Sequence, residues 1–144
     1  MDQPPAIPQK NEIIVYQPDE TIRLEVRLEN DTVWLSQSQM AELFGCTIRN
    51  IRLHLQNIYQ GHELQEDATR KDFFLVRFEG IREVSRFVAC YNQDAIISVG
   101  YRVNSIRGVK FRQWATQVLR QYLLRGYAVN DRLELPSAEV PSRL

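Results

Sequence analysis

Five side chains between positions 47 and 56 have the chemistry needed to read the edges of DNA bases. Arginine can bridge the edge of guanine or bind phosphate, glutamine can pair with adenine, and isoleucine can rest against the methyl group of thymine. If residues 47–58 form a recognition helix, Arg49 and Arg52 are the expected base or phosphate readers, and the other three are secondary. The five residues are Thr47, Ile48, Arg49, Arg52 and Gln56.

The residues around this segment match a helix-turn-helix. Ala41 is a small residue that lets two helices cross closely, and Gly45 can adopt the positive φ of a tight turn. Ser36, with Gln39 three residues later, is an N-cap candidate for the first helix, and Thr47 is one for the second. The alternative is an ordinary two-helix corner whose arginines are solvated. Apolar residues at three- and four-residue spacing predict a shared core of Met40, Leu43, Phe44, Cys46, Ile51 and Leu55.

Alternating apolar and charged residues predict a small sheet before the two helices and a hairpin after them. A hairpin directly behind a recognition helix is typical of the wing of a winged helix-turn-helix, where Arg77, Arg82 and Arg86 could touch the DNA backbone. The alternative is a sheet that only covers the helices. Residues 61–71 are polar and predict a loop. The predicted strands cover residues 13–16, 22–29, 32–35, 73–78 and 82–91.

The C-terminal third predicts two helices. The first follows a cap at residues 92–94 and runs through Gly100, and the second is a long amphipathic helix over 109–125 that Gly126 closes. The apolar face of the long helix is wide enough for both the core and a dimer contact. Residues 102–108 between them read either as a polar loop that could hold a phosphate or as a helix-to-helix connection with side-chain caps.

Charge is distributed unevenly along the chain, although the formal net charge is zero. The first 35 residues carry seven acidic and three basic side chains, whereas the last 50 carry three acidic and eight basic ones. Such a basic stretch suits phosphate contact, and the alternative is that its arginines cover apolar surface or pair with the acidic N-terminal third. The expected backbone contacts are Arg102, Arg107, Lys110 and Arg112.

Length and composition bound the remaining possibilities. The 144 residues predict one domain over 12–128, between a disordered tail at 1–11 and a flexible one at 129–144. Two cysteines are too few for a disulfide scaffold, and neither a signal peptide nor a membrane-spanning run is present, so we expect a soluble cytoplasmic protein. His54 is expected to be a partly buried packing residue. No catalytic or metal-binding motif is recognisable, so we expect neither an enzyme nor a cofactor.

Two blocks of sequence resemble the virulence RhuM family of bacterial proteins. The first is VWLSQSQMAELFG at residues 33–45, and the second, longer and more specific, is YNQDAIISVGYRVNS at residues 91–105, which continues to residue 116. The resemblance covers roughly residues 12–128. It implies the family and its fold but no particular reaction.

Together these features predict an α+β protein, namely a winged helix-turn-helix-like domain with small antiparallel sheets and a long C-terminal amphipathic helix. The expected function is binding of double-stranded DNA in transcriptional regulation, and a homodimer would suit the reading of two half-sites. The alternative is a protein-interaction module, antitoxin-like or antirepressor-like, without sequence-specific DNA binding. The salt dependence of binding distinguishes the two functions, because DNA binding weakens steeply with salt and binding through an apolar interface does not.

Overall fold

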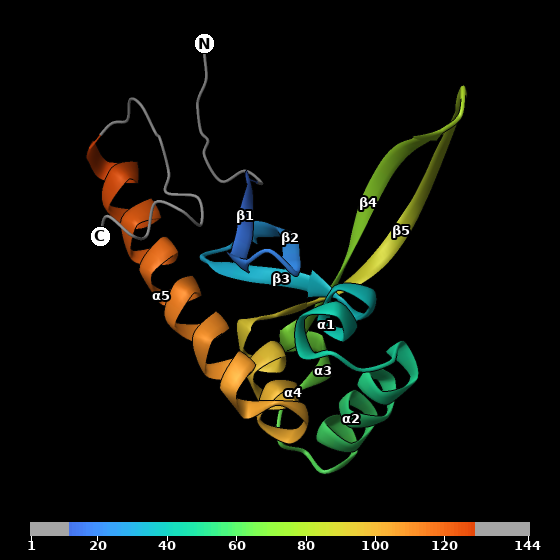
Figure 1. Cartoon of the computed structure of the whole chain (residues 1–144), viewed down its shortest axis with the longest axis vertical. Helices are drawn as coiled ribbons and strands as arrows, with labels where there is room; N and C mark the ends of the chain where they lie inside the picture. Colours follow the sequence, from blue (N-terminus) through green and yellow to red (C-terminus); the bar gives the residue numbers. More distant parts are fainter. Residues whose placement is uncertain (1–11, 129–144) are drawn as a thin grey trace.

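A computed structural model describes residues 12–128 of the chain. Within that range five strands form one antiparallel sheet in the order β1-β2-β3-β5-β4 (Figure 1). The strands are β1 (Glu12–Asp19), β2 (Ile22–Glu29), β3 (Thr32–Ser36), β4 (Arg70–Glu79) and β5 (Arg82–Asn92). The helices are α1 (Gln37–Phe44), α2 (Ile48–Gln60), α3 (Glu66–Thr69), α4 (Gln93–Val103) and α5 (Ser105–Ala128). The predicted α+β class with a long C-terminal helix is therefore confirmed.

The first three strands form the meander that the sequence predicts. Every second residue of β2 is apolar and buried, while the intervening charged residues are exposed or half-buried, so one face of the strand packs on the helices. Asn30 and Asp31 both have positive φ, 57° and 62°, as the two central residues of a tight hairpin turn require. These turn residues set the register in which Leu28 pairs with Val33.

The later hairpin differs from expectation in two ways. We expected small separate sheets, but β5 runs on to Asn92, and its last three residues pair with β3 and so join the hairpin to the meander. The segment 61–71 is also not entirely a loop, because α3 and the start of β4 lie within it. The Thr69 hydroxyl, which donates to the Gln65 carbonyl at 2.8 Å, stabilises this short helix and is buried.

One hydrophobic core lies between the sheet and the helices. Helix α5 crosses the end of β1, where Tyr16 packs edge-on against Phe111, with ring centroids 5.1 Å apart, and also contacts Trp114 at 4.8 Å. Side chains of α1, α2 and α4 complete the same cluster. A smaller cluster of Trp34, Phe73 and Cys90 lies apart from it.

Helix α5 is longer than predicted at both ends. It begins at Ser105, because the Asn104 side chain caps it by accepting a hydrogen bond from the Arg107 N–H at 3.3 Å. The helix also continues through Gly126 to Ala128, since a single glycine costs a helix only about 1 kcal/mol and does not by itself end it. No helix within residues 12–128 is long and apolar enough to cross a membrane. The tails expected at 1–11 and 129–144 lie outside the described residues.

Candidate nucleic-acid interface

Helix α1 is fixed at its start by the capping box that the sequence predicts. The backbone N–H of Gln39 donates to the Ser36 hydroxyl at 3.2 Å, and the Ser36 N–H donates to the Gln39 side-chain oxygen at 3.0 Å. The Gln39 side-chain amide also donates to the carbonyl oxygen of Glu25 in β2 at 2.8 Å. This second contact ties the helix to the sheet, so the orientation of α1 follows the sheet.

The turn between α1 and α2 is built around Gly45. This glycine has a φ of +72°, in the left-handed region that glycine tolerates best, and its N–H and that of Cys46 both donate to the Ala41 carbonyl, at 2.9 and 3.0 Å. The Thr47 hydroxyl then accepts from the Asn50 N–H at 3.1 Å and caps α2. Both predicted N-caps and the predicted turn glycine are confirmed.

Helix α2 has one buried and one exposed side. Ile51, Leu55 and Ile58 are buried against the core. The guanidinium groups of Arg49 and Arg52 have no hydrogen-bond or ion-pair partner among residues 12–128. The structure thus brings the five predicted readers together on solvent-facing positions of one helix and its cap. They are Thr47, Ile48, Arg49, Arg52 and Gln56, all exposed.

The basic residues of α4 and α5 that we expected to contact the DNA backbone divide into two pairs. Arg102 pairs with Glu63, and the Arg107 guanidinium donates to the carbonyl oxygen of Leu43 at 2.9 Å. Residues 102–108 do not form a polar loop, because they comprise the end of α4, the capping residue Asn104 and the first turn of α5. Lys110 and Arg112 are exposed on α5 and line a hollow beside Tyr16, to which α2 contributes no residue.

A groove that the sequence did not predict lies beside the start of α2. Ile48 lines it from α2, Gln37 and Ser38 line it from the first turn of α1, and Arg86 lines it from β5. Arg27 reaches it from β2, with its guanidinium carbon 4.5 Å from the centre of the Phe73 ring. The sequence could have indicated the position of Arg27, because the strict alternation of β2 places this residue on the sheet face opposite the core.

Comparison with known protein families identifies the chain. The model of the virulence protein RhuM family matches residues 68–140. The chain belongs to this family. The RhuM family match begins at the end of α3 and includes β4, β5, α4 and α5, so the resemblance at residues 91–116 falls inside it and the one at residues 33–45 does not. No curated protein and no solved structure matched the chain.

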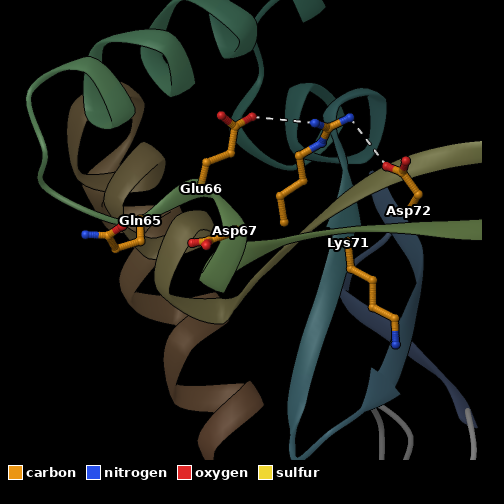
Figure 2. Close-up of a pocket in the computed structure, with 6 residues that line it drawn as sticks. Gln65, Glu66, Asp67, Lys71 and Asp72 are labelled. Atoms are coloured by element: carbon orange, nitrogen blue, oxygen red, sulfur yellow. Dashed lines mark hydrogen bonds and ion pairs between the residues drawn. The ribbon is translucent and has the colours of Figure 1, made fainter.

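A second hollow of this RhuM family protein is mainly acidic. Figure 2 shows Glu66 and Asp72 joined by dashed lines to the Arg70 guanidinium, at 3.5 and 3.4 Å, while Lys71 points away from these carboxylates. Asp67 lines the same hollow. Because Arg70 is engaged by two carboxylates and the hollow is acidic overall, this surface does not suit phosphate.

The two histidines do not form a site with other ligand side chains. His54 is half-buried on α2, as expected of a packing residue, and its Nδ1 atom has no hydrogen-bond partner among the described residues. His62 follows Gly61 in the exposed turn after α2. Within residues 12–128 no three His, Cys, Asp or Glu side chains are grouped as metal ligands would be.

Proposed function

We propose that this chain binds double-stranded DNA through α2 and acts as a transcriptional regulator of winged helix-turn-helix type. The observation that carries the proposal is the exposed side of α2. Arg49 and Arg52 are exposed there without intramolecular partners among the described residues, while Ile51 and Leu55 hold the other side in the core. A helix fixed on one side and bearing unpaired arginines on the other suits insertion into the major groove.

The order of the elements supports the winged form of the motif. The chain passes from β3 through α1 and α2 to the hairpin of β4 and β5, and β3 pairs with β5. This is the arrangement in which a hairpin can flank a recognition helix and contact the DNA backbone. Arg86 lines the groove beside the start of α2, with a long 3.8 Å ion pair to Glu79, and Arg82 is exposed near the hairpin tip.

Not all of the other basic residues that we expected to contact DNA are available for it. Arg102 and Arg107 already bind groups within the chain, so we assign them a structural role. Lys110 and Arg112 have no such partner among residues 12–128, but they lie on α5 beside the end of β1. The proposed interface therefore depends first on Arg49 and Arg52.

The test is a salt titration of binding to a random pool of duplex DNA, with the bound fraction sequenced. We expect a steep salt dependence and an enriched motif, because cationic side chains displace counterions from phosphates. The double variant Arg49→Ala/Arg52→Ala should bind the motif at least about tenfold more weakly, since one good base contact is worth about 1–3 kcal/mol.

A control variant removes the same charge elsewhere. Arg23→Ala/Arg120→Ala changes two exposed arginines on β2 and α5 and should bind like the native protein. Equal binding by the native chain and the α2 variant would contradict the assignment of α2 as the reading helix. A regulatory role is tested by placing the enriched motif beside a promoter and measuring its output with and without the protein.

A protein-interaction module is the second candidate function, and the exposed apolar residues of the hairpin favour it. Phe74, Phe78 and Phe87 are all more than half exposed. Absence of DNA binding even at low salt would support this candidate.

A further inference from the structure

The hairpin of β4 and β5 projects from the body of the molecule as a two-stranded ribbon (Figure 1). Its strands pair without a register shift from Arg70 opposite Tyr91 to Glu79 opposite Arg82. Only residues 90–92 of β5 pair with another strand, so the rest of the ribbon has no third strand beside it in the described chain. A two-stranded ribbon alone is at best marginally stable in water.

One face of this ribbon is apolar and exposed. Phe74 and Phe87 lie opposite each other with ring centroids 5.0 Å apart, yet they are 56% and 67% exposed. Val76 and Phe78 continue the face at 51% and 69% exposure, and Ile81 at the tip is 98% exposed. Contiguous exposed apolar side chains on a soluble domain mark an interaction surface.

The outer edge of β4 is also open. β4 is the last strand of the sheet, and the short α3 lies only beside its beginning. Natural edge strands are protected by short length, by bulges or by charge. β4 is ten residues long and pairs with β5 without a bulge. Its charged residues lie toward the two ends of the strand and leave the apolar run Phe73-Phe74-Leu75-Val76 uninterrupted.

We propose that β4 pairs antiparallel with β4 of a second copy of this chain and joins the two hairpins into a four-stranded ribbon. A two-fold axis through Leu75 places Phe74 opposite Val76 of the other copy. It also places Lys71, which pairs with Glu29 of its own chain, opposite Glu79, which has only a long 3.8 Å ion pair to Arg86. The contact therefore depends first on the apolar side chains at its centre, and opposite charges rather than like charges face each other at its ends.

The end of α5 gives a weaker basis for a dimer. The apolar face of this helix is buried from Phe111 to Val118, so the core takes the part that we expected it to share with a dimer contact. Leu123 and Leu124 are exposed near its C-terminal end. Nothing in the structure shows what covers them.

The proposal is tested by measuring the molar mass of the full chain in solution without DNA, by sedimentation equilibrium. We expect twice the 16.9 kDa of one chain. Phe74→Lys/Val76→Lys should abolish the dimer, because lysine then faces lysine across the interface in both symmetric contacts. Phe74→Lys/Val76→Glu should restore it, because each lysine then faces a glutamate. This second variant loses the same aromatic contact within the hairpin, so it also controls for damage to the fold.

Ile106→Lys/Leu124→Lys provides a matched control, since it places two lysines at exposed apolar positions of α5 and should remain dimeric. A monomeric native chain, a dimeric Phe74→Lys/Val76→Lys variant, or failure of the glutamate variant to dimerise would each overturn the proposal. Because the measurement contains no DNA, its failure is separate from any failure of the proposed DNA binding.

Discussion

The Arg107 guanidinium of α5 donates a 2.9 Å hydrogen bond to the carbonyl oxygen of Leu43 in the last turn of α1. The carbonyl groups at the end of a helix have no partner within it, so this contact satisfies one of them and places a positive charge at the negative end of the helix dipole. It also joins the C-terminal helix to the turn that orients α2. The long helix thus stabilises the geometry of the proposed interface from behind.

Replacing Arg107 with alanine should lower the free energy of unfolding by about 1.5 kcal/mol, because a hydrogen bond from a charged donor is lost. Urea denaturation measures this loss, and Arg112→Ala, an exposed change on the same helix, should stay within about 0.5 kcal/mol of the native protein. We expect the salt dependence of DNA binding to stay the same in the Arg107 variant. A flatter salt dependence with unchanged stability would instead identify Arg107 as a phosphate contact.

Gly45→Ala and Gly80→Ala should differ in their effect on stability. Both glycines have a φ near +70°, so both variants should lose about 1–2 kcal/mol to backbone strain. A Cβ atom on Gly45 would also lie 3.3 Å from Nη1 of Arg107, whereas one on Gly80 would meet nothing within 4 Å. We expect the Gly45 variant to lose about 1 kcal/mol more, through the weakened Arg107 hydrogen bond. In an Arg107→Ala background this difference should disappear.

Gly100→Ala should destabilise the packing of α4 against α5. An added Cβ would lie 3.0 Å from Cζ of Phe44 and 3.1 Å from the backbone Cα of Gly108, and neither the buried ring nor the helix backbone can move freely. Overpacking of this kind typically costs about 1–3 kcal/mol, which thermal or urea unfolding would detect. Ser98→Ala, on the same helix but less buried, is the control, and a Gly100 variant as stable as this control would contradict the close crossing.

The two cysteines should react with thiol reagents at different rates. Burial raises the pKa of the Cys90 thiol to about 11, so only about one molecule in a thousand carries the reactive thiolate at pH 8. Burial also raises the pKa of Cys46, but this residue is only half-buried. Mass spectrometry of the native protein should therefore find Cys46 labelled first. Labelling of Cys90 should accelerate in denaturant, and equal rates in the folded protein would contradict the burial of Cys90.

Removing the cap of α1 should weaken the link between this helix and the sheet. Ser36→Ala deletes the acceptor of the Gln39 N–H, and such N-cap losses cost about 0.5–2 kcal/mol. Ser38→Ala, an exposed change in the first turn of the same helix, should have little effect on urea unfolding. Similar stability of the two variants would show that the capping box contributes little.

Local patterns in the sequence were sufficient to predict most of the helices and strands. The alternation of β2, the caps Ser36 and Thr47, and the turn at Gly45 each depend on neighbouring residues, whose preferences act over one turn or one strand. The exposed positions of the five predicted readers also followed from sequence, because a helix that buries Ile51, Leu55 and Ile58 on one side turns its other side to solvent.

Tertiary contacts decided what these patterns could not. Gly100 and Gly108 allow α4 and α5 to approach closely, and this role depends on the point at which the two helices cross. Arg102 binds Glu63, and Arg107 binds the carbonyl oxygen of Leu43, so neither guanidinium is free to contact phosphate. Both partners lie far away in the sequence, about 40 and 60 positions along the chain. The joining of two predicted sheets into one, and with it the projecting hairpin with its open edge, was likewise fixed by pairing between β3 and β5. Sequence periodicity records which side of an element is apolar, but it does not record which distant element lies there.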